Sequence, residues 1–469
     1  MDTSDAAGSD AVWSDAVAQA SAIRNGAVSA TELLDEYLGR IDELDGLLRA
    51  YVTVDVEGAR AAARQADAMI ASQATDDLPP FLGVCISVKD VVDVTGLPTT
   101  HSCKVLVDNV AQRDDRVVAR FRDAGFIILG KTNVPEFCTS MTSSEINGVC
   151  RNPWDMERTP GGSSGGAAAA LAAALCAVAH GTDGAGSVRV PASFCGLVGL
   201  KPTRGVGFEV EEGNPYYGTS VDGTMTRSVR DAAAMLNVLG VRGTDAAGSE
   251  PAQLRVAVST TAPFGEVDRE CAHAALQVGE TLESLGHIVD ARTPNWMTIL
   301  VAAAGPMSVP GAAALVRHDQ RDLLEPRNRP VLDALASLTV VEHARWVDLV
   351  RDAARDFMEF WADVDVLITP TSGILPPSVS WAPWDQTPEE HMATFSTFPN
   401  FAHPFNLSGQ PALSVPVACS DGDLPIGVQL AGRRHDEATL LRIGAELESA
   451  MPWAGRRPAL NRSAPNVGA

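Results

Sequence analysis

Apolar and polar positions along the chain fall into short alternating blocks that predict a protein of strands and helices. Between residues 11 and 75 the apolar residues recur with helical spacing, and Ser29 followed by Glu32 is typical of a capped helix start. Later blocks are short and wholly apolar, which indicates buried strands. We predict strands over 82–88, 126–129, 254–258, 365–369, 412–417 and 426–430, and helices over 117–126, 227–239, 437–448 and most of 295–352.

This alternation predicts the α/β class, with one large domain built on a mixed, mainly parallel central β-sheet that helices cover on both faces. The sequence shows no internal repeat and no linker, so residues 1–469 are expected to form a single unit. We place its core at about 75–240 and 360–450, and a variable helical insertion at about 295–355.

The longest apolar stretch, 167–179, is rich in alanine and too short to cross a bilayer. It predicts a buried helix that ends near His180 and Gly181, where glycine can adopt the left-handed conformation of a helix end. Residues 1–10 are polar and acidic and do not resemble a secretion signal. The eight cysteines show no paired spacing, which is typical of reduced thiols. We therefore expect a cytoplasmic protein.

The charge balance limits the classes of partner. The chain has 36 basic and 59 acidic side chains, a formal net charge of −23. Nucleic acid and anionic membranes would be repelled, so neither is expected as a partner. No H-E-x-x-H motif and no compact His/Asp group is present, so the sequence predicts no metal and no cofactor. A small-molecule substrate is the remaining expectation, and a homodimer stays an open option.

Two glycine-rich blocks carry candidate chemistry. Residues 161–165 match G-x-S-x-G, the nucleophile elbow of α/β-hydrolases, but 151–160 cannot form the buried strand that should precede an elbow. An esterase of that fold is therefore disfavoured. The second block, 184–187, offers consecutive backbone N–H groups with little side-chain bulk, as the binding of an oxyanion requires. A turn of small residues is also common without any catalytic role.

A serine nucleophile needs a base. None of the nine histidines has motif support, and His180 is explained by its expected place at a helix end. Lys89 ends a buried strand, where burial would favour its neutral form and allow it to accept a proton. Most lysines are solvated surface groups, so the residues alone leave the choice of base and nucleophile open.

Seven blocks, taken together, resemble the amidase signature enzymes. They occur in the same order and cover nearly the whole chain, from about Trp13 to Glu448. The blocks are 83–90, 159–166, 181–192, 199–203, 225–231, 367–371 and 409–416.

The resemblance implies a catalytic triad of serine, cis-serine and lysine, in which Ser187 is the nucleophile. Ser163 would be the bridging serine, held by a cis peptide bond, and Lys89 the base. The product would be an acyl-enzyme on Ser187 that water hydrolyses. The implied oxyanion hole is formed by Gly184, Ala185, Gly186 and Ser187, and the implied supporting residues are Ser164, Asp183 and Arg189.

The chain departs from the family pattern at Ala185, often glycine, at Ala167, often serine, and at Cys85, often proline. None of these belongs to the triad. Loops that vary within the family build its substrate pockets, so we take 300–345 and the short run Thr139, Ser140 and Met141 as candidate substrate-binding segments.

The function implied is hydrolysis of the C–N bond of a linear or cyclic carboxylic amide to an acid and an amine or ammonia. Segments 179–183 and 191–196 look closer to the branch of amidases that resembles 6-aminohexanoate cyclic-dimer hydrolases. One alternative is the amidase subunit of glutamyl-tRNA(Gln) amidotransferase, but that subunit usually has tyrosine where this chain has Arg204. Esterase or aryl acylamidase activity of the same site is another. A binding protein without catalysis is disfavoured because all three triad residues are present.

Overall fold

The computed structural model describes residues 11–72, 77–205, 219–241, 253–301 and 316–460. The predicted polar amino terminus, 1–10, and part of the predicted insertion, 302–315, lie outside this range. The helices are α2 (Ala16–Arg24), α3 (Ala30–Leu48), α4 (Val56–Ser72), α5 (Arg116–Asp123), α6 (Gly165–Ala172), α7 (Arg189–Cys195), α8 (Val229–Val238), α9 (Arg269–Ser284), α10 (Met297–Leu300), α11 (Arg329–Ser337), α12 (Val340–Phe357), α13 (Pro388–Ser396), α14 (His403–Ser408) and α15 (Glu437–Ala450).

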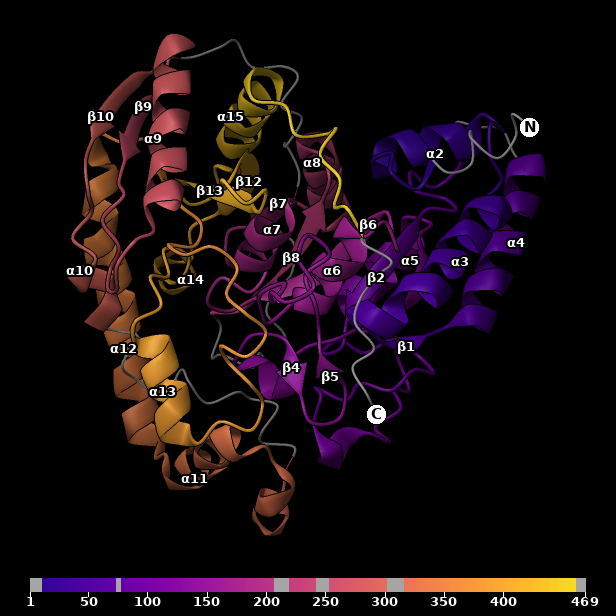
Figure 1. Ribbon diagram of the computed structural model, residues 1–469, viewed down its shortest axis with the longest axis horizontal. Helices are drawn as coiled ribbons and strands as arrows, with labels where there is room; N and C mark the ends of the chain where they lie inside the picture. Colours follow the sequence, from indigo (N-terminus) through magenta and orange to yellow (C-terminus); the bar gives the residue numbers. More distant parts are fainter. Residues whose placement is uncertain (1–10, 73–76, 206–218, 242–252, 302–315, 461–469) are drawn as a thin grey trace.

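The strands are β1 (Tyr51–Val54), β2 (Cys85–Lys89), β3 (Ile127–Thr132), β4 (Ser143–Ser144), β5 (Gly148–Val149), β6 (Val178–Asp183), β7 (Val198–Lys201), β8 (Val221–Thr226), β9 (Arg255–Val258), β10 (Ile288–Ala291), β11 (Val366–Pro370), β12 (Ala412–Cys419) and β13 (Pro425–Gly432). Eleven of them form one sheet in the order β1-β3-β2-β6-β8-β7-β12-β13-β11-β9-β10 (Figure 1). β1 at one edge of this sheet, and β9 and β10 at the other, lie outside the predicted core ranges.

The α/β class and the single mixed sheet are confirmed, but the sheet is less parallel than expected. Parallel pairs form two groups, β3-β2-β6 and β11-β9-β10. The strands between β6 and β11 pair antiparallel. β12 and β13 are joined by a short turn, which permits only an antiparallel pair because a parallel pair needs a long crossover.

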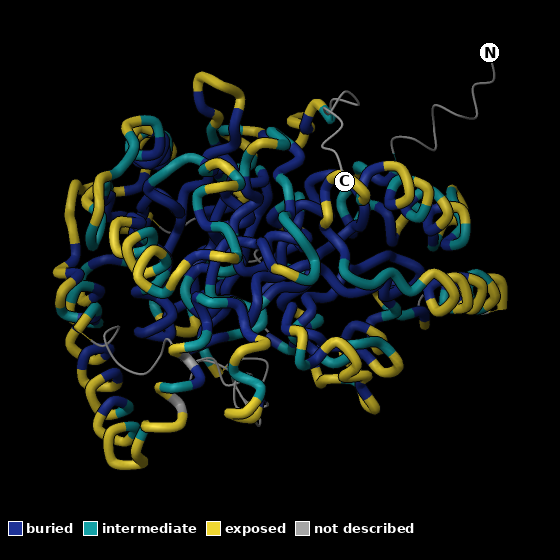
Figure 2. Tube along the Cα trace, turned by 60° about the horizontal axis from the view of Figure 1, so that its bottom comes forward, coloured by how far each residue is buried: buried dark blue, intermediate teal, exposed yellow. Residues whose placement is uncertain are grey.

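Helices cover both faces of the sheet, as expected. Along β11 successive side chains point to opposite faces. Val366 and Ile368 pack in a cluster with residues of α8, α9 and α15. Leu367 packs on the other side with residues of α10, α12 and α14. The sheet is therefore buried on both sides at β11, and exposed residues gather at the periphery of the molecule (Figure 2).

The alanine-rich segment differs from its prediction. The helix α6 ends at Ala172, and β6 follows at Val178, so His180 lies in a strand and not at a helix end. Alanine favours helices intrinsically, but β6 gains pairing with β2 and β8, and such tertiary pairing overrides propensity. Every residue of α6 is buried. The short helix and strand bring the two glycine-rich blocks to the same end of the sheet.

The amino-terminal helices are confirmed, including the capping box between Ser29 and Glu32. The predicted strands are also confirmed, as β2, β3, β9, β11, β12 and β13. Besides β6, which was expected to be helical, four sheet strands have no counterpart in the prediction: β1, β7, β8 and β10. They are short, and each of them contains threonine, glycine, lysine or aspartate, so their sequences lack the apolar run that marks a buried strand.

Candidate active site

The residues of interest lie where two parallel neighbours end. Lys89 is the last residue of β2, and Thr182 and Asp183 are the last residues of the adjacent strand β6. The Gly162–Ser163 peptide bond, just before α6, is cis. The sheet thus brings segments near residues 89, 163 and 187 together, although they are far apart in the sequence.

The side chain of Lys89 is fully buried and points at a serine. Its Nζ donates to Ser163 Oγ at 2.8 Å, to Thr182 Oγ1 at 2.8 Å and to the Thr182 carbonyl at 3.2 Å. Burial lowers the pKa of Lys89, while the nearby Cys138 thiol and the Asp183 carboxylate oppose this effect. The amine therefore loses its proton more readily than a surface lysine.

Ser187 is half-buried in the turn that follows β6. Its carbonyl accepts a hydrogen bond from the Ser164 N–H at 3.2 Å, and the Ser164 hydroxyl donates to the Thr182 carbonyl at 3.3 Å. Ser164 therefore ties the first glycine-rich block to the second. Among the hydrogen bonds of the described residues, none joins the hydroxyls of Ser163 and Ser187, so the structure contains the lysine contact of the implied relay and not the serine–serine contact.

A buried ion pair holds this turn. The Asp183 carboxylate accepts from the Gly186 N–H at 2.8 Å, the Val188 N–H at 3.2 Å and the Arg189 guanidinium at 2.8 and 2.9 Å. Both charged side chains are fully buried. Burial alone would raise the pKa of Asp183, but the charge and hydrogen bonds of Arg189 outweigh it and hold that pKa well below its usual range.

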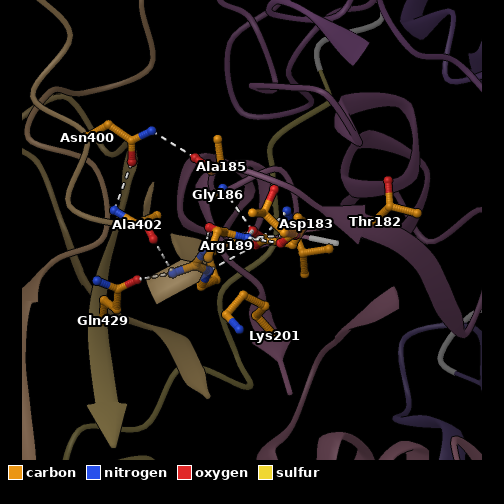
Figure 3. Close-up of polar contacts among 12 residues, drawn as sticks. Thr182, Asp183, Ala185, Gly186, Arg189, Lys201, Asn400, Ala402 and Gln429 are labelled. Atoms are coloured by element: carbon orange, nitrogen blue, oxygen red, sulfur yellow. Dashed lines mark hydrogen bonds and ion pairs between the residues drawn. The ribbon is translucent and has the colours of Figure 1, made fainter. Parts of the chain in front are cut away.

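Arg189 is in turn fixed from the other half of the chain (Figure 3). Its guanidinium donates to the Ala402 carbonyl at 2.9 Å, to Gln429 Oε1 at 2.7 Å and to Asn406 Oδ1 at 2.6 Å. Asn400 Nδ2 donates to the Ala185 carbonyl at 2.8 Å. Sequence reasoning missed Thr182, Asn400, Asn406 and Gln429. Thr182 lies inside a family block, whereas Asn400 and Asn406 come from a segment without any motif.

The implied oxyanion donors are not equivalent. The Gly186 N–H is engaged by Asp183, and φ of Gly186 is +110°, a conformation that favours glycine. In the described part of the chain, the N–H groups of Gly184, Ala185 and Ser187 have no acceptor. Ala185 is absent from the residues with left-handed φ, so its methyl group is compatible with the turn.

The candidate substrate-binding run adjoins the cis peptide. A β-carbon on Gly162 would lie 2.2 Å from the Ser140 carbonyl oxygen, so this backbone contact requires glycine. Ser140 is buried and its hydroxyl has no partner among the described residues. The Thr139 hydroxyl donates to Asn328 Oδ1 at 2.7 Å, which links the predicted helical insertion to this run. Met141 is buried in an apolar cluster with Val190.

A cavity of about 580 Å³ lies elsewhere, between α2, α5 and α8. Phe81, one of its lining residues, precedes β2, so the cavity lies at the opposite end of that strand from Lys89. It contains none of the predicted site residues.

Among the helices of the described residues, none is long and apolar enough to cross a membrane.

Comparison with known proteins decides the family. The amidase family model matches residues 32–441. The chain belongs to the amidase signature family. It is 39% identical to a protein of Mycobacterium tuberculosis that is named as the amidase AmiB2. The match covers 96% of this chain and 99% of that protein. It is 36% identical to the 6-aminohexanoate-cyclic-dimer hydrolase of a Pseudomonas species, over 96% of this chain and 97% of that enzyme.

The solved structure of a 6-aminohexanoate cyclic dimer hydrolase complexed with substrate superposes with a TM-score of 0.87 at 34% identity, covering 96% of this chain and 99% of that one. These findings confirm the family resemblance that the seven blocks indicate. They show that this amidase signature protein is an amide-hydrolysing enzyme that acts on small molecules.

Proposed function

We propose that this amidase hydrolyses a carboxylic amide through an acyl-enzyme on Ser187, which is activated by a relay through Ser163 to Lys89. The observation that carries the proposal is the 2.8 Å contact between Lys89 Nζ and Ser163 Oγ, made by a fully buried amine whose pKa burial lowers. A neutral, desolvated lysine is a competent base for a serine nucleophile.

The chemistry balances in two steps. As Ser187 Oγ bonds to the amide carbon, its proton moves to Ser163 Oγ while the Ser163 proton moves to Lys89 Nζ. The relay then returns a proton to the departing nitrogen, the C–N bond breaks, and an ester to Ser187 and a free amine or ammonia remain. Water repeats the sequence on the ester, releasing the acid and regenerating the hydroxyl.

Backbone donors stabilise the charge that develops on the substrate oxygen. The unengaged N–H groups of Gly184, Ala185 and Ser187 support this role, whereas the Gly186 N–H serves to hold the turn through Asp183. Each such donor contributes on the order of 10²–10³ in rate in comparable sites. We therefore propose three donors in place of the four that the family pattern implies.

Linear and cyclic amides both remain within this proposal, as the cyclic-dimer hydrolase relatives suggest. A free-standing hydrolase is favoured over an amidotransferase subunit by Arg204. Its guanidinium donates to the Asn406 carbonyl at 3.1 Å, beside the segment that supports Arg189, so this departure from the subunit pattern is built into the site.

The test is a panel of linear amides, anilides, cyclic amides and esters, assayed for released amine or acid without any partner protein or added glutamine. The wild-type enzyme should hydrolyse members of the panel, and Ser187→Ala and Lys89→Ala should each lose that activity. Hydrolysis by Ser187→Ala at the wild-type rate would overturn the mechanism. Turnover that requires a partner and glutamine would favour the amidotransferase subunit.

A further inference from the structure

Three aromatic rings belong to an apolar cluster that reaches the Ser187 turn. We call Trp381, Phe395 and Phe398 the ring cluster. The ring centroids are 5.3 Å apart for Trp381–Phe395, 5.8 Å for Trp381–Phe398 and 6.2 Å for Phe395–Phe398. Phe398 is 5% exposed, whereas the other two rings are half-buried. The accessible faces of Trp381 and Phe395, together with Phe398, form an apolar surface suited to an apolar group of a ligand.

The ring cluster is continuous with the Ser187 turn. It packs in one apolar cluster with Met141, Val190 and Ala402. A β-carbon on Gly186 would lie 2.8 Å from Ala402 Cβ and 3.2 Å from Val190 Cγ2. Ala402 and Val190 of this apolar cluster therefore lie close to Gly186, the residue before the proposed nucleophile.

Polar atoms at the edge of the ring cluster also lack partners. Within the described residues, Ser140 Oγ, Gln386 Oε1 and His391 Nδ1 are buried without a hydrogen bond. Ser140 precedes Met141, and the His391 ring lies 4.9 Å from the Phe395 ring. Buried polar atoms are normally satisfied, so a ligand or water that brings hydrogen-bonding groups is expected here.

The charges around this surface indicate a neutral ligand. The buried guanidinium of Arg327 is paired with Glu325 at 2.6 Å. Burial, and after it the charge of Arg327, lowers the pKa of His391 to about 4, so its imidazole is neutral at pH 7. The imidazole therefore offers no charge to an anionic substituent, and the guanidinium is already held by Glu325 and by the Ser143 carbonyl at 2.8 Å.

From this juxtaposition we infer that the ring cluster binds the acyl portion of the substrate and makes the enzyme selective for neutral amides of aryl or arylalkyl carboxylic acids. The inference rests on the proposed function. The acyl portion stays bonded to Ser187 through both steps while the amine leaves, so in this proposal the ring cluster contacts the same group in the amide and in the acyl-enzyme. Trp381 and Phe395 are then specificity-determining residues.

Two anilides with the same leaving group, acetanilide and phenylacetanilide, test this inference. The wild-type enzyme should prefer the phenylacetyl substrate. Trp381→Ala should lower kcat/KM for phenylacetanilide by about 10–100-fold, the range that apolar pocket contacts provide, and change that for acetanilide by less than about 3-fold. Phe395→Ala, at a half-exposed position on α13, should act in the same direction if Trp381→Ala folds poorly.

Met392→Ala is the matched control, because this side chain lies on the same helix, is 68% exposed and is absent from the ring cluster. It should leave both rates unchanged. A wild-type enzyme that prefers acetanilide, or variants that lower both rates equally, would overturn the inference and leave the proposed function intact. If the wild-type enzyme hydrolyses no amide at all, by contrast, the proposed function itself is contradicted.

Discussion

At the residue scale, the properties of this site follow from burial. Lys89 Nζ has one buried hydroxyl and one threonine as hydrogen-bond partners, and the carboxylate of Asp183 is committed to Arg189 and to backbone donors. Within the described residues the lysine thus has no direct ion pair, while the aspartate is compensated by Arg189. Burial consequently pushes Lys89 toward its neutral form and leaves Asp183 ionised.

Substitution of Lys89 by arginine tests the need for a neutral base. Because only the unprotonated amine accepts a proton, kcat/KM of the wild-type enzyme should rise with pH and level off below the ordinary lysine value of 10.5. Lys89→Arg stays protonated and should lose about 10²–10⁴-fold in kcat/KM at every pH. Lys104→Arg, a change at a partly exposed lysine, is the control and should keep the wild-type profile. An active Lys89→Arg enzyme would exclude lysine as the base.

Asp183→Asn tests the buried ion pair. It would leave the Arg189 charge uncompensated, and the expected loss is about 3–5 kcal/mol in the free energy of unfolding at pH 7. The pKa of Asp183 is lower in the folded chain, so its contribution is present above the unfolded value, near 3.8, and is lost as the pH falls toward the folded value. The stability difference from wild type, measured by denaturant unfolding, should therefore shrink below about pH 4. Asp319→Asn, an exposed partner of Arg317, should show no measurable change.

At the element scale, the sequence predicts those strands that are continuous apolar runs between breakers. Residues 127–130 and 366–368 are examples. It misassigns β6 because Val178 and Ala179 continue an alanine-rich run, and only pairing with β2 and β8 makes them extended. The blocks that hold Lys89, Ser163 and Ser187 are recognisable as sequence, but Asn400 and Asn406 reach the site through folding alone.

The fit of α6 under the sheet yields a prediction about glycine. A β-carbon on Gly166 would lie 2.4 Å from the Asn133 backbone nitrogen and 2.5 Å from the Ala50 carbonyl oxygen. Backbone cannot yield easily, so Gly166→Ala should destabilise the protein by about 1–3 kcal/mol or more. Gly46→Ala is the control: this glycine lies in helix α3 with nothing within 4 Å, and alanine there should stabilise by about 0.5–1 kcal/mol. Thermal unfolding of both variants gives the comparison, and equal effects would contradict the packing of α6.

At the scale of the whole molecule, the large two-sided core determines which groups meet solvent. All eight cysteines are free; six of them are buried, Cys138 is half-buried and Cys419 is exposed. A reagent can modify a buried thiol only when the core unfolds around it. The number of reactive thiols in the native enzyme therefore measures how intact the core is.

Thiol titration of the native enzyme should therefore find about two reactive groups, Cys419 promptly and Cys138 more slowly, and eight after denaturation. The variant Cys419→Ser should lose the prompt group. Reaction of all eight thiols in the native enzyme at one rate would contradict the buried core.

The most direct test of the central claim, that Ser163 and Lys89 activate Ser187, is covalent labelling by a fluorophosphonate, with the modified peptide located by mass spectrometry. The label is predicted on Ser187 in the wild-type enzyme, absent from Ser187→Ala, and formed at least about 10²-fold more slowly in Ser163→Ala and Lys89→Ala. Label on a different serine, or labelling of Ser187 at the wild-type rate in Lys89→Ala, would contradict it.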